Sequence, residues 1–187
     1  MTDAPKETAA ERLAGDPGPA ETVERIVRVD HAGEYGAKRI YAGQLAILGQ
    51  SEHGPILRHM AEQEEEHLRY FEGEIGDRGV RPTVLLPIWH AAGFALGAAT
   101  ALMGPRAAMA CTVAVEEAID EHYRAQLDTL GDDEADLRRS IAKFREEELE
   151  HRDIGLEREA ELAPGYGALS HVIKRGSKLA IWLSERF

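Results

Sequence analysis

Two short segments of the sequence place a glutamate and a histidine three residues apart. Glu64 and His67 form the first pair, and Glu148 and His151 form the second. On an α-helix, side chains at positions i and i+3 lie on one face, so each pair projects a carboxylate and an imidazole together. These groups are suitable ligands for iron or manganese. Two Glu-x-x-His pairs on separate helices therefore predict one metal site shared between them.

The apolar residues around each pair predict that it faces inward. Phe71 follows His67 by four residues, and Phe144 precedes Glu148 by four residues. This spacing places an aromatic side chain on the same helical stripe as each pair. Glu147 is not on that stripe, so we expect Glu148 and not its neighbour to serve as a ligand.

A further glutamate precedes each pair and interrupts an otherwise apolar helical stripe. Glu34 precedes the first pair and Glu116 the second, at nearly equal spacings. The chain is therefore predicted to form two helical hairpins, each supplying Glu and then Glu-x-x-His. Four carboxylates and two imidazoles in one cavity require cations to be stable. Two iron or manganese ions would balance the four carboxylates, and a carboxylate can bridge both ions.

Four other residues are candidates for supporting roles. Tyr123 lies two helical turns from Glu116 and is either a buried core residue or a redox or supporting residue. His122 either hydrogen-bonds to the site or lies at the surface. Asp30 is a candidate to orient a ligand imidazole, because a metal-bound histidine usually donates its other N–H to an acceptor. Cys111 is expected to pack in the core.

Helical periodicity extends over most of the chain. Residues 1–20 are rich in proline, glycine and charge and are expected to form a flexible tail, followed by one domain over residues 21–187. The fold class predicted from this pattern is all-α. The expected helices span about residues 21–48, 55–75, 106–130, 134–162 and 168–185.

The segment from residue 82 to residue 104 has an unusual composition. It contains no Lys, Arg, Asp or Glu, and His90 is its one readily titratable residue. Three interpretations remain open: a membrane-spanning helix, a buried core helix, or a core helix that also meets lipid or a lipid-like ligand. Proline and glycine within the segment make it a poor spanning helix.

Charge and cysteine content exclude several classes of protein. The 187 residues include 22 Lys and Arg against 34 Asp and Glu, so the net charge of −12 argues against a nucleic-acid partner. One cysteine permits neither an internal disulfide nor a thiolate-only metal site. The N-terminus shows neither a secretory signal nor a transit peptide. A basic strip in the last helix, formed by His171, Lys174, Arg175 and Lys178, fits either an anionic membrane surface or an ordinary solvated face.

Several phrases of the sequence resemble the demethoxyubiquinone hydroxylase family of ubiquinone biosynthesis. They are RVDHAGEYGA at residues 28–37, CTVAVEE at 111–117, EELEHRDIGL at 147–156 and AIWLSERF at 180–187. The similarity runs from about residue 22 to the end of the chain. It implies a ferritin-like four-helix bundle with an additional apolar helix and a C-terminal amphipathic helix.

The resemblance also implies a di-iron carboxylate centre and a monooxygenase activity. Its six ligands would be Glu34 and Glu116 as terminal ligands, Glu64 and Glu148 as bridging ligands, and His67 and His151 as one imidazole for each iron. The implied reaction uses O₂ to hydroxylate the ring of a polyprenyl demethoxyubiquinol. NADH is the implied source of electrons. A lipid-binding accessory protein is a further implied partner.

The implied location is the cytoplasmic face of a bacterial cell membrane, with peripheral attachment. A hydrophobic substrate would explain the apolar segment. We expect Leu86, Trp89, Phe94 or Leu96 to lie on the route of the prenyl tail. The main alternative function is iron storage or ferroxidase activity on the same fold. A rubrerythrin-like peroxidase would normally carry a Cys-x-x-Cys module that is absent from the sequence, and a tRNA-modifying hydroxylase conflicts with the negative charge.

Overall fold

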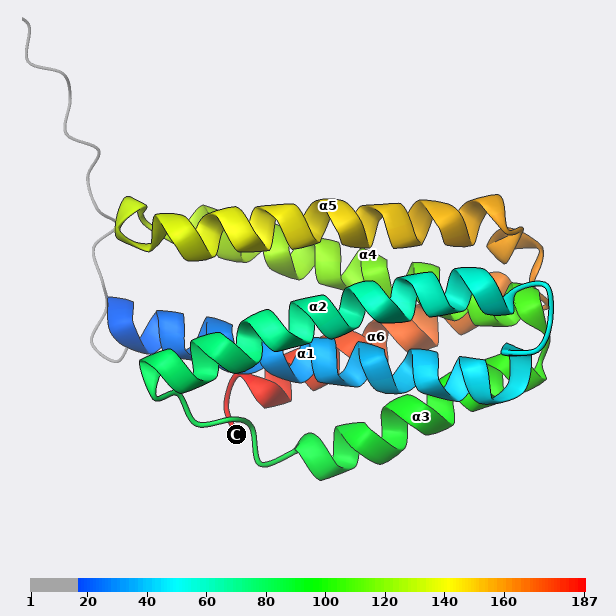
Figure 1. The fold of residues 1–187 in the computed structure, drawn as a ribbon, viewed down its shortest axis with the longest axis horizontal. Helices are drawn as coiled ribbons and strands as arrows, with labels where there is room; N and C mark the ends of the chain where they lie inside the picture. Colours follow the sequence, from blue (N-terminus) through cyan, green and yellow to red (C-terminus); the bar gives the residue numbers. More distant parts are fainter. Residues whose placement is uncertain (1–16) are drawn as a thin grey trace, which may run out of the picture.

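The structure is a computed structural model that describes residues 17–187, and within this range every regular element is helical. This confirms the all-α fold class. Figure 1 shows the helices running roughly along the long axis of the molecule. The elements are α1 (Pro19–Leu48), α2 (Gly54–Arg78), α3 (Leu86–Leu102), α4 (Pro105–Thr129), η1 (Asp132–Glu134), α5 (Ala135–Glu157), η2 (Ala160–Leu162) and α6 (Tyr166–Ser184).

Two antiparallel hairpins form the four-helix core. Helices α1 and α2 form the first hairpin, and α4 and α5 form the second. Helix α3 connects the hairpins and packs along the outer side of α1, at the bottom of Figure 1, whereas α6 packs along α4. The predicted bundle with one additional apolar helix and one C-terminal helix is therefore present.

Two helix ends differ from the expected boundaries. Helix α2 continues through Gly76 to Arg78 and ends at Gly79, whose φ of 65° is the left-handed conformation that glycine adopts easily. Helix α5 ends at Glu157, because Glu159 has a φ of 63° and starts the separate turn η2. Most of the predicted tail over residues 1–20 lies outside the described residues, and α1 begins at Pro19.

Glycines allow α3 to lie directly on the backbone of α1. A methyl group placed at Gly93 would be 2.9 Å from the carbonyl oxygen of Gly36. A methyl group at Gly97 would overlap the carbonyl oxygen of Ile40, and one at Gly43 would overlap that of Phe94. The seam between the two helices therefore depends on small residues from both sides.

Two clusters of buried apolar residues lie at opposite ends of the four-helix core, and a third, smaller cluster joins α4 to α6. One cluster includes Leu57, Met60 and Met109, and the other includes Phe71 and Ile141. Buried polar residues, described below, occupy the level between them. The aliphatic and aromatic ends hold the four helices together, and this packing fixes the positions of the polar side chains in the middle.

The C-terminal basic strip is not a uniformly solvated face. Lys174 forms an ion pair with Glu117 of α4, and Lys178 pairs with Glu121 of the same helix. Arg175 is exposed, beside the exposed apolar residue Val172. Two of the four residues that could have met an anionic surface are thus neutralised within the chain.

Helix α3 presents an exposed apolar face. Among residues 17–187, no helix combines the length and apolarity needed to cross a bilayer. Ile88 is 55% exposed, and Leu102 near the other end of α3 is 72% exposed. This helix has no charged residue, and its apolar side chains are exposed at both ends. Covering such a surface with lipid or protein would be energetically favourable.

Candidate metal centre

Six residues predicted as metal ligands converge in the middle of the four-helix core. Glu34 comes from α1, Glu64 and His67 from α2, Glu116 from α4, and Glu148 and His151 from α5. All six are buried. The helical spacing explains this arrangement, because each side chain lies on the stripe that its helix turns toward the core.

The six residues divide into two overlapping groups. Glu34, Glu64, His67 and Glu148 can place one ligand atom each within 4.8 Å of one another. A second group contains Glu116 and His151 together with the same Glu64 and Glu148. Two carboxylates are therefore common to both groups, as bridging ligands would be. Their assignment as ligands is a prediction that we develop below.

Both imidazoles turn the same ring nitrogen toward the carboxylates. Nδ1 of His67 lies 3.2 Å from Oε1 of Glu148 and 3.5 Å from Oε2 of Glu34. Nδ1 of His151 lies 3.1 Å from Oε2 of Glu148 and 3.3 Å from Oε1 of Glu64. The two histidines thus meet Glu148 from opposite hairpins, and each Nδ1 also lies near one further carboxylate.

The other ring nitrogens contact two residues that the sequence analysis did not predict. Nε2 of His67 lies 3.0 Å from Oε2 of Glu147, and Nε2 of His151 lies 3.0 Å from Oε1 of Gln63. Each partner directly precedes a glutamate of the site and reaches the histidine of the opposite hairpin. This doublet, Gln or Glu followed by Glu-x-x-His, was the available signal in the sequence.

Two tyrosines also form hydrogen bonds from one hairpin to the other. The Tyr123 hydroxyl donates a hydrogen bond to Glu34, and the Tyr41 hydroxyl donates one of 3.3 Å to Glu116. Each tyrosine follows a site glutamate by seven residues but bonds to the glutamate of the other hairpin. Sequence reasoning selected Tyr123 and missed the equivalent Tyr41.

Burial and charge shift the pKa values of the site strongly. Burial and the neighbouring carboxylate of Glu148 hold the pKa of Glu64 and of Glu116 well above the usual range. Burial alone would lower the pKa of His67, but hydrogen bonds to Glu148 and Glu34 outweigh it and raise the pKa to about 12. The pKa of His151 is raised in the same way by Glu148. Protons thus neutralise charge that metal cations would neutralise.

The unsatisfied oxygens of the site fit a metal centre. Both carboxylate oxygens of Glu64 are buried and accept no hydrogen bond from any described residue, and the same holds for Oε2 of Glu34 and Oε2 of Glu116. Buried carboxylate oxygens that accept no hydrogen bond are costly in a folded protein. Metal cations would satisfy all four oxygens at once, so the residues present fit a two-metal centre.

His122 and Asp30 contact each other, and neither contacts a site imidazole. Nε2 of His122 lies 3.3 Å from Oδ1 of Asp30, and the Gln126 amide donates a 2.6 Å hydrogen bond to the same oxygen. The expectation that Asp30 orients a ligand imidazole is wrong, because Glu147 and Gln63 occupy that position. Cys111 is buried in an apolar cluster, as expected.

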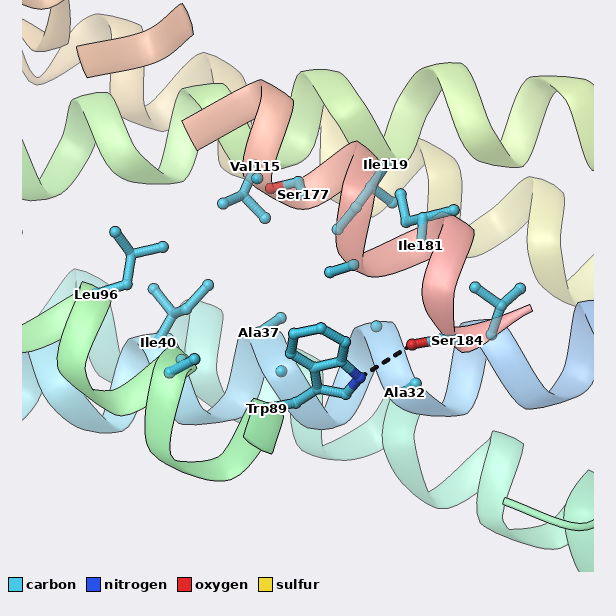
Figure 2. Close-up of a pocket in the computed structure, with 17 residues that line it drawn as sticks. Ala32, Ala37, Ile40, Trp89, Leu96, Val115, Ile119, Ser177, Ile181 and Ser184 are labelled. Atoms are coloured by element: carbon cyan, nitrogen blue, oxygen red, sulfur yellow. Dashed lines mark hydrogen bonds between the residues drawn. The ribbon is translucent and has the colours of Figure 1, made fainter. Parts of the chain in front are cut away.

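An apolar cavity of about 370 Å³ lies beside the candidate centre. Its walls come from α1, α3, α4 and α6, as Figure 2 shows. Trp89 projects into it and donates a 3.0 Å hydrogen bond to Ser184. The lining residues Gly33 and Val115 directly precede Glu34 and Glu116, so the cavity adjoins the backbone that carries these carboxylates.

Comparison with known proteins shows similarity along nearly the whole chain. The family model described as ubiquinone biosynthesis protein COQ7 matches residues 21–184. The chain is 59% identical over 182 residues to the 3-demethoxyubiquinol 3-hydroxylase of Rhodospirillum rubrum, covering 97% of this chain and 86% of that protein.

Eukaryotic proteins show the same similarity at lower identity. The human mitochondrial NADPH-dependent 3-demethoxyubiquinone 3-hydroxylase is 55% identical over 168 residues, covering 88% of this chain and 78% of the human protein. The mitochondrial 5-demethoxyubiquinone hydroxylase of Saccharomyces cerevisiae is 39% identical over 184 residues, covering 89% and 79% of the two chains.

Proposed function

The chain belongs to the ubiquinone biosynthesis protein COQ7 family, and from this premise we propose that it hydroxylates the ring of a polyprenyl 3-demethoxyubiquinol with O₂. The observation that carries the proposal is the pair of overlapping Glu and His groups in a chain so similar to named hydroxylases. Iron storage, the alternative function, is not favoured, because the similar proteins are named as hydroxylases of this pathway.

The proposed metal ligands are the six buried residues of the candidate centre. Glu34 and His67 would hold one iron, Glu116 and His151 the other, and Glu64 and Glu148 both. Two irons bound there would supply the reducing power and the binding site that O₂ activation requires. Four carboxylates balance two divalent ions, which supports a pair of irons over a single ion.

The chain itself contributes ligand positioning and the exclusion of water. The apolar clusters at both ends of the core keep bulk water away from the carboxylates. Tyr123 and Tyr41 hold one oxygen each of Glu34 and Glu116 by hydrogen bonds. Burial and nearby carboxylates raise the pKa of both phenols well above 10, so each keeps its proton and can act as a donor.

The apolar cavity is the proposed position of the isoprenoid part of the substrate. Trp89 and Leu96, two of the four residues expected on the route of the tail, line this cavity, whereas Leu86 and Phe94 do not. Small residues of α1, such as Ala32 and Gly36, leave space along the α1 wall. An almost entirely apolar lining suits a hydrocarbon chain and offers little to a hydrophilic substrate.

Peripheral membrane attachment would bring this cavity to its substrate. The exposed apolar faces of α3 and α6 belong to two of the helices that line the cavity. Among the described residues, no carboxylate lies within salt-bridge distance of three arginines near the α1–α3 seam: Arg28, Arg39 and Arg81. Carboxylate-free arginines beside an apolar helix favour an anionic lipid surface.

Electron supply and location complete the proposal. We retain reduced nicotinamide as the source of electrons; the names of the mammalian relatives specify NADPH, whereas the resemblance implied NADH. The proposed location is the cytoplasmic face of a bacterial cell membrane, which fits the similarity to the Rhodospirillum rubrum protein. A lipid-binding accessory protein remains a proposed partner.

Quinone profiling tests the proposed function directly. A bacterial strain that lacks its own demethoxyubiquinol hydroxylase accumulates the demethoxy precursor, and this chain should restore ubiquinone. The Glu148→Ala variant should not restore ubiquinone and should purify with little iron, because it loses a carboxylate common to both metal positions. Glu150→Ala, an exposed residue on the same helix, is the matched control and should behave like the unmodified chain. Failure of the unmodified chain to restore ubiquinone would refute the proposal.

A further inference from the structure

The two halves of the candidate centre differ in the group that faces Nε2 of each imidazole. Nε2 of His67 faces a carboxylate oxygen of Glu147, whereas Nε2 of His151 faces the amide oxygen of Gln63, both at 3.0 Å. Two other contacts are matched in kind. Each imidazole turns Nδ1 to Glu148, and each unshared glutamate accepts a hydrogen bond from a tyrosine of the opposite hairpin.

Lys143 holds the carboxylate of Glu147 in place beside His67. Nζ of Lys143 lies 3.0 Å from Oε1 of Glu147, which leaves Oε2 for His67. The Glu147 side chain is 24% exposed, so it lies at the edge of the core rather than in bulk solvent. Gln63 presents a neutral amide oxygen to His151.

We propose that this difference makes the two metal positions unequal, with the ion on His67 held more tightly than the ion on His151. The inference rests on the proposed metal centre. A carboxylate that accepts the second N–H of a ligand imidazole makes the ring a stronger donor to the metal, and a neutral amide oxygen does so less. Glu147 and Gln63 are therefore positioning residues that set the order in which the two positions fill.

The test titrates the metal-free full-length protein with Co²⁺, a spectroscopic substitute for Fe²⁺, followed by absorbance and calorimetry. We expect two binding steps whose affinities differ by about tenfold or more. Glu147→Gln should weaken the tighter step by about 10–100-fold, the usual effect of removing such a partner. Gln63→Glu should strengthen the weaker step by a similar factor. Glu146→Gln, an exposed neighbour of Glu147, is the control for charge alone and should change neither step.

Each outcome separates this inference from the proposed metal centre. Thermal unfolding of every metal-free variant shows whether it is folded, and Gln63→Glu provides a test that does not depend on the folding of Glu147→Gln. If the protein binds two Co²⁺ ions with affinities that neither substitution changes, the two positions are equal and the inference is wrong, while the metal centre stands. If the folded protein binds no Co²⁺, the metal centre itself fails, and this inference fails with it.

Discussion

At the scale of single residues, the site is built by exchange between two similar hairpins. Tyr41 of the first hairpin bonds to Glu116 of the second, and Tyr123 of the second bonds to Glu34 of the first. Gln63 and Glu147 make the corresponding exchange with the histidines. Each group that orients a candidate ligand therefore comes from the opposite hairpin, so the centre depends on the hairpins packing in one relative position.

The Tyr123→Phe variant should retain two irons per chain and lose about tenfold in turnover. The phenol is not one of the six candidate ligands, but it holds one oxygen of Glu34, and a hydrogen bond to a charged group contributes about 1.5–3 kcal/mol. Iron analysis and turnover of purified protein check both parts. Tyr70→Phe is the control, because Tyr70 packs against the same apolar cluster, and no hydrogen bond joins its side chain to the six residues. Unchanged turnover would identify Tyr123 as a packing residue only.

At the scale of elements, α3 determines how the site meets its surroundings. It has no charged residue, it packs on α1 through glycines, and it contributes one wall of the apolar cavity. Close approach of the two backbones leaves little room for side chains in the seam, so the larger residues of α3 are directed to the cavity or to the surface. This explains why a strongly apolar segment remains substantially exposed.

Gly97→Ala should destabilise the fold by about 1–3 kcal/mol, the usual cost of overpacking. The added methyl group would overlap the backbone of Ile40 on α1, so α3 would have to move away. Gly73→Ala is the matched control in α2, where nothing lies within 4 Å of the added methyl group, and it should stabilise the protein by up to about 1 kcal/mol. Chemical denaturation measures both, and equal stabilities for the two variants would contradict the tight α1–α3 seam.

Ile88→Glu should reduce binding to liposomes and turnover of a long-tailed quinol. Ile88 is 55% exposed on α3, and a carboxylate there resists entry into hydrocarbon by a few kcal/mol. Iron content and turnover of a short-tailed soluble quinol should be unchanged.

Leu156→Glu is the control for this experiment, because Leu156 is 38% exposed on α5, which does not pack against α3. If Ile88→Glu lowers turnover of the short-tailed quinol as much as that of the long-tailed quinol, α3 supports the bundle and is not a route from the membrane.

At the scale of the whole molecule, the buried charges couple metal binding to folding. Four carboxylates and two imidazoles lie in one water-poor layer between the apolar ends of the core. Without metal, the folded chain keeps this layer neutral by retaining protons, whereas the unfolded chain releases them at ordinary pKa values. The stability of the metal-free protein should therefore depend on pH in a direction that the pKa shifts determine.

We expect the metal-free protein to lose stability as pH rises from about 5 to about 8. The raised pKa values of Glu64 and Glu116 make the folded chain bind more protons than the unfolded chain above 4.5, and stability then falls with rising pH. The raised pKa values of His67 and His151 act in the same direction above 6.5. The lowered pKa of Glu148 has its effect below 4.5, outside this range. Each group contributes up to about 1.4 kcal/mol per pH unit.

Urea unfolding of chelator-treated protein at several pH values measures this dependence. Bound metal should remove most of it, because the metal occupies the oxygens and nitrogens that would otherwise take up protons. The Glu64→Gln/Glu116→Gln double variant is the control for general charge repulsion and should show a shallower slope. A metal-free protein that becomes more stable toward pH 8 would contradict the raised pKa values assigned to the site.

The sequence alone determined the helices and the six candidate ligands, because helical periodicity converts spacing into direction. Glu148 and His151 must lie on one helical face with Phe144, whatever the rest of the fold does. The all-helical bundle, its two hairpins and its apolar segment follow from the same local rules. Periodicity did not predict the end of α5, where the left-handed conformation of Glu159 interrupts the expected helix.

The tertiary structure decided every contact that crosses between hairpins. Spacing within one helix does not reveal which residue of another helix faces Nε2 of His67. The sequence therefore predicts Glu147 to be uninvolved and Asp30 to orient an imidazole, whereas Glu147 makes this contact. The pairing of Lys174 with Glu117, and the direction in which Trp89 projects, likewise depend on how α3 and α6 pack. Local periodicity fixes the face on which a side chain lies, but only the packing of whole helices fixes what that face meets.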